Sequence, residues 1–158
     1  EQAKRALEIE DFSQAVIAGI DYTVSCLGQL IPMDCISVED ANEMAHCLQS
    51  LKTDGEIMKY CAALEVEQPS TFTGALDIAI DIDDYELISD SEREYGRQVL
   101  CRIGADDELI DTIDGYMDFA QLGRDSMAED GVRRTEFGLV RRLSSPFPPE
   151  PEIGQSML

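Results

Sequence analysis

The sequence is poor in positive charge and in histidine, and it has no long apolar run. Only 12 of its 158 residues are lysine or arginine, and it contains 1 histidine. No stretch approaches the roughly 18 consecutive apolar residues of a membrane-spanning helix. The first residues also lack the basic start and apolar stretch of a signal peptide. We therefore expect a cytoplasmic protein that is neither secreted nor held in a membrane.

The motifs of several enzyme classes are missing as well. The sequence contains no G-x-S-x-G elbow, no phosphate-binding G-x-x-x-x-G-K and no dinucleotide-binding G-x-G-x-x-G. Its 5 cysteines include no C-x-x-C pair, which favours reduced, mostly buried thiols over a disulfide framework or a zinc site. Cysteine catalysis needs a nearby base, and His46 is the sole histidine. We predict a binding protein without catalytic residues, cofactor or metal.

The densest acidic cluster, Asp81 to Glu86, does not fit a calcium-binding loop. In a loop that starts at Asp81, the fifth position is Tyr85 and the sixth is Glu86, where the tight turn requires glycine. An EF-hand is therefore rejected. A weak, non-specific cation site at this cluster and an enzyme with a carboxylate-bound metal remain as alternatives.

Negative charge is the outlying property of the composition. The sequence has 33 acids and a formal net charge of -21. Residues 39–130 hold 24 acids and 6 bases, a net of -18, whereas residues 131–149 hold 4 arginines and 1 glutamate, a net of +3. Such a field repels nucleic acid and anionic lipid and attracts basic protein surfaces. We expect a basic protein partner, with solubility as the alternative reason for the acidity.

Capping residues and periodic apolar positions predict a series of helices. Ser37 and Asp40 form a capping pattern that opens a helix ending near Lys52. A second helix follows residues 53–55 and stops before Pro69, because proline disrupts a helix interior. Further helices are predicted at 70–80, 91–104, 106–113 and 118–128.

Strand signals lie at both ends of this helical series. The β-branched segment 15–27 predicts a strand or hairpin, residues 85–89 a strand, and residues 132–143 a hairpin that pairs with 85–89. We expect a helical turn in residues 1–10. The predicted fold is α+β, with an N-terminal β-containing segment (1–36), a central helical cluster (37–82), a C-terminal lobe of a short antiparallel sheet packed with helices (83–143), and an extended proline-rich tail (144–158).

The spacing of the acids suggests an imitation of DNA. Carboxylates at i, i+3 or i+4 on a helix lie roughly 5 to 6 Å apart, and DNA carries one charge per roughly 3.4 Å along each strand. A merely solvated face is the alternative for each acidic row. The candidate partner-binding residues are Asp77, Asp81, Asp83, Asp84, Glu86, Asp107, Asp111, Asp114, Asp118, Asp125 and Glu129.

Four segments make residues 37–142 resemble the ArdA-type antirestriction family. They are VEDANEMAHCLQSL (38–51), ALDIAIDIDDYELI (75–88), EYGRQVL (94–100) and the stretch 114–142, which contains Gly131, Thr135 and Gly138. The resemblance implies an elongated DNA mimic, encoded on mobile genetic elements, that occupies the DNA-binding groove of type I restriction-modification enzymes. The alternative is an acidic protein-interaction module of a conjugative or mobile-element protein without DNA mimicry.

The resemblance also implies a dimer formed through the C-terminal lobe. The predicted hairpin is rich in arginine, which can meet the acids of a second copy. A homodimer is therefore possible, through Arg133, Arg134, Arg141 and Arg142.

Overall fold

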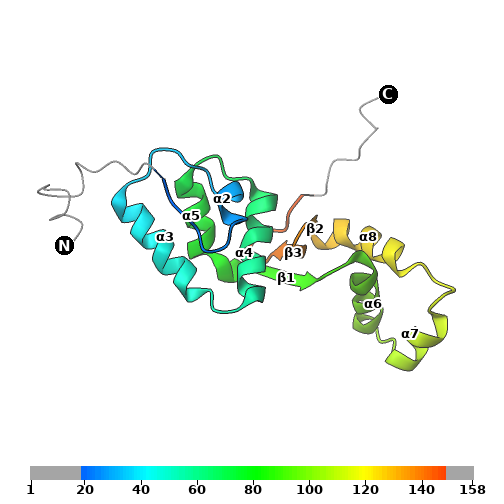
Figure 1. Cartoon of the computed structure of the whole chain (residues 1–158). Helices are drawn as coiled ribbons and strands as arrows, with labels where there is room; N and C mark the ends of the chain where they lie inside the picture. Colours follow the sequence, from blue (N-terminus) through cyan, green and yellow to red (C-terminus); the bar gives the residue numbers. More distant parts are fainter. Residues whose placement is uncertain (1–18, 149–158) are drawn as a thin grey trace, which may run out of the picture. The chain divides into compact units, whose positions relative to one another are not determined.

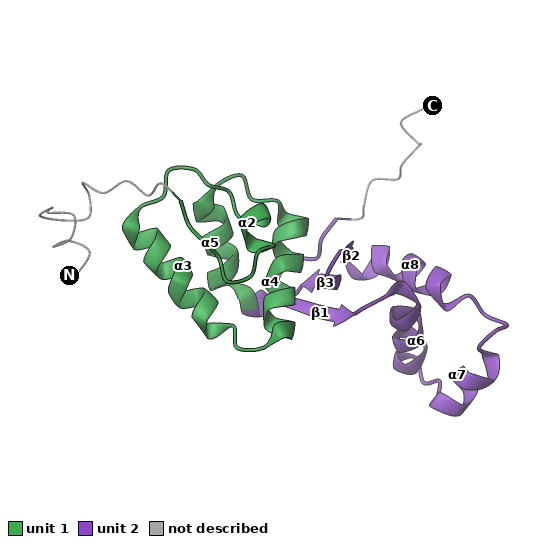
Figure 2. Cartoon of the chain, in the orientation of Figure 1, with its two compact units in different colours: residues 1–82 green, residues 83–158 purple. Residues whose placement is uncertain are grey.

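The computed structural model describes residues 19–148 (Figure 1). The helical turn predicted for residues 1–10 lies outside this range. Two compact units divide the chain between Ile82 and Asp83 (Figure 2). In the range described, no helix combines the length and the apolar character needed to cross a bilayer.

Unit 1, up to Ile82, is helical over its described residues. Three of the four described helices begin at side-chain caps. Ser37 Oγ accepts a 3.0 Å hydrogen bond from the Asp40 amide, as the sequence predicts, and Thr53 and Glu56 form a reciprocal capping box. Such caps satisfy amides that have no partner within the helix. The helices are α2 (Leu27–Leu30), α3 (Val38–Ser50), α4 (Asp54–Glu67) and α5 (Phe72–Ile80).

Helix α4 forms the centre of unit 1. Five consecutive residues from Tyr60 to Leu64 are buried, and five consecutive helical positions point in all directions around the axis. A helix that is buried all round belongs inside a core. The Tyr60 hydroxyl donates a 2.9 Å hydrogen bond to the Ala75 carbonyl of α5 and lies 3.6 Å from the Met44 sulfur of α3.

The strand predicted over residues 15–27 is wrong in the part that the structure describes, while residues 15–18 lie outside it. Residues 19–22 have no regular structure, residues 23–24 form a bend and residues 25–26 a turn, followed by α2. The amides of Leu27 and Gly28 bond to carbonyls three residues back, those of Val24 and Ser25. At the end of this segment a local turn, and not a neighbouring strand, therefore accepts the backbone hydrogen bonds. Burial of Leu27 in the helical core overrides the β propensity of the segment.

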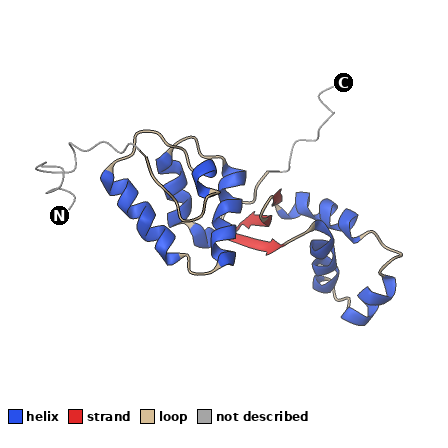
Figure 3. Cartoon of the chain, viewed as in Figure 1, coloured by secondary structure: helices blue, strands red, loops and turns tan. Residues whose placement is uncertain are grey.

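Unit 2, from Asp83, combines helices with a sheet, so the chain has the predicted α+β fold with a C-terminal antiparallel sheet (Figure 3). A 3-10 turn, η2 (Ile82–Asp84), leads into the first strand. The elements that follow are β1 (Tyr85–Ser89), α6 (Glu92–Arg102), α7 (Asp107–Ile113), α8 (Phe119–Asp130), β2 (Val132–Thr135) and β3 (Gly138–Arg142).

The sheet is antiparallel with the order β1-β3-β2. The predicted hairpin is β2 and β3, and its pairing with residues 85–89 is confirmed because β1 pairs with β3. The Thr135 hydroxyl donates a 2.7 Å hydrogen bond to the Gly138 carbonyl across the turn. Gly138 has a φ of 126°, which only glycine adopts readily.

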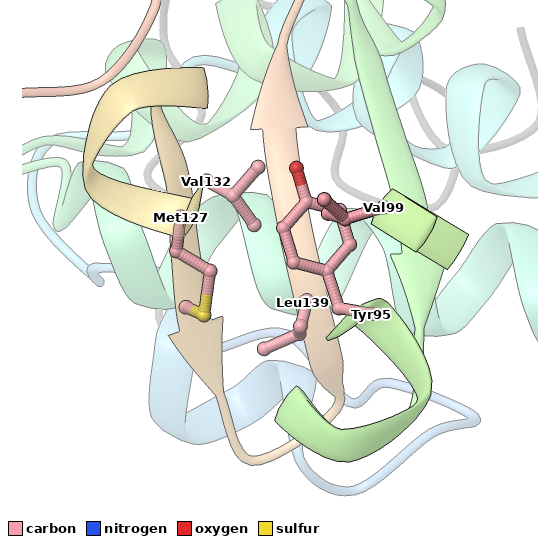
Figure 4. Packing of buried hydrophobic residues seen from close by; sticks show 5 residues of the cluster. All are labelled: Tyr95, Val99, Met127, Val132 and Leu139. Atoms are coloured by element: carbon pink, nitrogen blue, oxygen red, sulfur yellow. The ribbon is translucent and has the colours of Figure 1, made fainter. Parts of the chain in front are cut away.

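Helices α6 and α8 pack on the sheet around a small apolar core. Figure 4 shows side chains from both helices and from β2 and β3 pointing toward one another. The two helices approach closely at Gly96 and Gly123, where neither side chain keeps the backbones apart. The cluster consists of Tyr95, Val99, Met127, Val132 and Leu139.

The start of the proline-rich tail belongs to this unit. Phe147 is 5% exposed and stacks against Tyr85 of β1, with ring centroids 6.4 Å apart. The Arg142 guanidinium lies 4.8 Å from the centre of the Phe147 ring. Aromatic burial therefore anchors the tail up to residue 148 on the sheet, and residues 149–158 lie outside the described range.

Candidate protein-binding surface

The predicted acids at the end of α5 are available to a partner. Asp77 and Asp81 are exposed, and they lie one helical turn apart, since the Asp81 amide bonds to the Asp77 carbonyl. In the described chain, neither side chain forms a hydrogen bond or ion pair. Both carboxylates can therefore meet a cationic partner without giving up an internal contact.

Three further predicted acids lie at the start of unit 2, and two of them have structural partners. Asp83 is exposed, without a side-chain partner in the described range. Asp84 accepts hydrogen bonds from the Ser144 amide at 2.8 Å and from the Ser144 hydroxyl at 2.5 Å. Glu86 of β1 forms an ion pair with Arg141 of β3, its cross-strand neighbour.

The acidic row on α7 is partly neutralised by arginines of α6. Asp111 accepts from Arg97 at 3.3 Å, and Asp114 accepts from Arg93 at 2.6 Å. The hydrogen bond from Arg93 lowers the pKa of the Asp114 carboxyl below its ordinary value. Asp107 is exposed and has no such partner in the described range. Of the three acids in this row, Asp107 is therefore the one whose charge is not paired with an arginine in the described range.

Of the three predicted acids at α8, two accept hydrogen bonds and the third has no partner within the described residues. Asp118 caps the helix by accepting from the Gln121 amide at 3.0 Å, and Asp125 accepts from the Gln121 side-chain amide at 2.8 Å. Glu129 is exposed and has no partner within the described residues. The eleven predicted acids are all accessible at the surface to some degree, but not all are equally free to bind.

Two acids that the sequence analysis did not single out hold unit 2 together. Glu92 of α6 pairs with Arg124 of α8 at 2.9 Å and also with Arg134 of β2, and its side chain is only 12% exposed. Arg124 and Arg134 lie 32 and 42 residues from Glu92 in the sequence, so no local sequence pattern predicts these two ion pairs. Pairing of this kind requires knowledge of how α6, α8 and the hairpin pack.

Asp130, at the end of α8, is the second acid that was missed. It accepts hydrogen bonds from the Tyr95 hydroxyl and, at 3.1 Å, from Arg102. Burial opposes ionisation of this carboxyl, but the hydrogen bonds from Tyr95 and Arg102 outweigh burial and lower the pKa of Asp130. Burial, together with the bond to Asp130, raises the pKa of Tyr95 to about 12.

The arginines of the hairpin have partners in their own chain. Arg134 and Arg141 pair with Glu92 and Glu86, as described above. Arg133 donates to the Pro148 carbonyl at 3.2 Å, and Arg142 donates to the Ser145 carbonyl at 2.7 Å. A homodimer through these arginines stays a prediction, and it would require them to exchange or share these contacts.

In unit 1 the acids greatly outnumber the bases. Residues 19–82 contain 11 acids but only 2 bases, Lys52 and Lys59, a net of -9. Neither lysine forms an ion pair in the described chain. Exposed Glu39 and Glu43 of α3 lie four residues apart, the same spacing as Asp77 and Asp81. We call these four residues the unit 1 acids; the α3 pair is not among the acids predicted from the sequence.

Unit 1 also contains an apolar cavity of about 420 Å³. Val24 and Leu27 line one wall, and Met44 and Leu48 of α3 line another. Within the described residues, no group of three or more histidine, cysteine, aspartate or glutamate side chains is arranged to hold a metal ion. His46 is exposed on α3. Of the five cysteines only Cys61 is buried, which corrects the expectation of mostly buried thiols.

Part of the chain matches a known protein family. Residues 43–95 match DUF6329, described as a family of unknown function. The matched stretch begins in α3, crosses the division between the two units and ends in α6, and it covers less than half of the chain. No curated protein and no solved structure matches the chain. The ArdA-type resemblance therefore stays a prediction.

Proposed function

We propose that this protein is a DNA mimic with antirestriction activity, which acts in the cytoplasm by occupying the DNA-binding groove of a type I restriction-modification enzyme. The observation that supports the proposal best is the net charge of -9 over residues 19–82, where the lysines form no ion pair in the described chain. The ArdA-type resemblance supports the choice of partner. The proposed action is binding, with no bond made or broken.

The mechanism is competitive occupancy of a basic groove. Carboxylates one helical turn apart lie roughly 5 to 6 Å from each other, close enough to pair with lysines and arginines that otherwise contact successive phosphates. The unit 1 acids offer two such pairs, and Asp83, Asp107 and Glu129 add single exposed charges in unit 2. Release of counterions from both surfaces favours the complex and makes it sensitive to salt.

A second candidate function is an acidic protein-interaction module without DNA mimicry. The observation that favours it is the internal pairing in unit 2, where Glu86, Asp111 and Asp114 neutralise arginines of the same chain. Acids used in this way stabilise the fold and solubilise the surface, but they contribute less to an external array of charge. The two functions differ in whether duplex DNA competes for the same site on the partner.

A competition experiment tests the proposal. Binding of a fluorescent duplex to a purified type I restriction-modification complex is measured against increasing amounts of this protein, at several salt concentrations. DNA mimicry predicts competitive inhibition. The inhibition constant, calculated with the duplex affinity measured at each salt concentration, should rise at least about tenfold between about 50 and about 200 mM salt. Non-competitive inhibition, or tight binding that leaves the duplex in place, would contradict mimicry and support the second function.

Variants with matched charge sharpen the experiment. Replacing the unit 1 acids by Gln and Asn removes four exposed carboxylates. At about 0.5 kcal/mol each, the middle of the range for exposed pairs, the sum of about 2 kcal/mol should weaken inhibition roughly 30-fold. The control replaces four acids that have side-chain or cap contacts in unit 2, Asp111, Asp114, Asp118 and Asp125. Both variants change the net charge equally. Equal loss in both would indicate a general effect of net charge.

A further inference from the structure

Two cysteines of unit 1 lie in contact although they are 35 residues apart in sequence. The Sγ atoms of Cys26, just before α2, and Cys61, in α4, are 3.4 Å apart. The other three cysteines, Cys35, Cys47 and Cys101, make no such sulfur contact in the described chain. The fold thus selects one pair among the five thiols.

We propose that Cys26 and Cys61 are a redox-sensitive pair that forms a reversible intramolecular disulfide on exposure to a peroxide. A disulfide bond is about 2.05 Å long, so the two sulfurs need to approach by about 1.4 Å. The backbone around Cys26 is a turn leading into the short helix α2, which can adjust more easily than the buried helix α4. The proposal does not depend on the proposed function.

The surroundings of the two sulfurs set the order of the chemical steps. Burial, with the hydrogen bond to Cys26, raises the pKa of Cys61 to about 12, so this sulfur stays a thiol. Cys26 is half-buried and meets the oxidant first. Its thiolate attacks one oxygen of hydrogen peroxide, the O–O bond breaks, and Cys26 becomes a sulfenic acid with release of hydroxide, which takes up a proton to become water.

The second step closes the bond. The sulfur of Cys61 attacks the sulfur of Cys26, the S–O bond breaks, and the departing hydroxyl leaves as water with the proton of the Cys61 thiol. In sum, two thiols are oxidised to one disulfide while hydrogen peroxide is reduced to two molecules of water. A dithiol reductant reverses the change by thiol–disulfide exchange.

The disulfide would fix one wall of the apolar cavity. Val24 and Leu27 lie on either side of Cys26 in sequence, and both line the cavity. A bond from Cys26 to α4 ties this wall to the most buried helix of unit 1. It also closes a long loop that contains all of α3, which reduces the conformational freedom of the unfolded chain. Oxidation should therefore stabilise unit 1 and restrict the cavity.

Peptide mapping of the full chain tests the proposal. The protein is treated with increasing hydrogen peroxide, remaining thiols are alkylated, and the protein is digested without reductant for mass spectrometry. We expect a Cys26–Cys61 linked peptide that disappears with dithiothreitol. The proposal is overturned if Cys26 and Cys61 are still alkylated at peroxide concentrations that oxidise the exposed Cys35 and Cys101, or if their links are mainly to other cysteines.

Thermal unfolding of variants provides a second readout. Oxidised wild type should melt several degrees above reduced wild type, on the order of 5 to 10 °C. Cys26→Ser should abolish this shift, whereas Cys35→Ser, at an exposed position outside the pair, should retain it. A shift that persists in Cys26→Ser would refute the proposal. If Cys26→Ser does not fold, the peptide map of the wild type decides the question alone.

Discussion

Gly96 of α6 and Gly123 of α8 lie so close together that a Cβ placed on Gly96 would be 3.2 Å from the backbone nitrogen of Gly123. The reverse substitution gives a distance of 3.1 Å to the nitrogen of Gly96. Each added methyl group would also overlap a backbone carbonyl, that of Phe119 or Glu92. The absence of a side chain at these two positions therefore determines how closely α6 and α8 approach.

Replacement of Gly96 by alanine should destabilise the protein. Inside a helix this change normally stabilises by about 0.5 to 1 kcal/mol, but here the methyl group meets backbone that cannot rotate away. Overpacking typically costs about 1 to 3 kcal/mol, so we expect a net loss of this order in chemical denaturation. Gly55→Ala in α4 is the matched control, because its Cβ meets nothing closer than 3.9 Å. Equal stability of the two variants would contradict the close approach.

Neutralising Glu92 should lower the free energy of unfolding more than neutralising the nearby Glu94. Both lie in the first turn of α6, where a negative charge is favourable, so Glu92→Gln and Glu94→Gln lose the same helix-end contribution. Glu92 also pairs with Arg124 and Arg134, whereas Glu94 is 3.9 Å from Arg97 and half exposed. We expect about 1 kcal/mol of extra destabilisation for Glu92→Gln, measured by urea unfolding. A larger loss for Glu94→Gln would be inconsistent with the pairing.

Stability should fall in acid partly through Asp130. Its pKa in the folded protein is lowered, so its contribution is present above the unfolded-state pKa of about 3.9 and is lost as the pH falls through the folded value. Asp130→Asn should flatten the decline in the urea midpoint below about pH 4. The control is Asp114→Asn: the hydrogen bond from Arg93 also lowers the pKa of Asp114, but at a surface position where solvent screens the interaction. If the urea midpoint of Asp130→Asn declines in acid as steeply as that of the wild type, Asp130 does not contribute to the acid sensitivity.

Self-association, if it uses the hairpin, should depend on arginines that already have partners. Arg134 and Arg141 would have to exchange Glu92 and Glu86 for acids of a second copy. We therefore expect a dimer that weakens with salt and is lost in an Arg134→Ala, Arg141→Ala variant, measured by light scattering. A wild-type protein that is monomeric at high concentration and moderate salt would contradict the predicted dimer.

Local signals account for the parts of the fold that the sequence predicts. Ser37 and Ser91 each cap a helix at the predicted position, because a cap depends only on residues within one turn. The sequence predicts that residues 53–55 lie between two helices, whereas Thr53 caps α4, which begins at Asp54. The β-branched residues 20–24 mislead, because the local turn that leads into α2 and the burial of Leu27, and not β propensity, decide the conformation of this segment. The same limit applies to the acids. Sequence spacing brings Asp111 and Asp114 into one row, but only the packing of α7 beside α6 reveals that arginines hold them.

The completely buried stretch of α4, from Tyr60 to Leu64, makes the stability of unit 1 measurable in the intact chain. Amide protons there are protected both by the helix and by the core, so they exchange with deuterium only when the unit opens as a whole. Leu139 and Val140 of β3 occupy the equivalent position in unit 2. Exchange rates at these two places therefore report separately whether the units open together or independently.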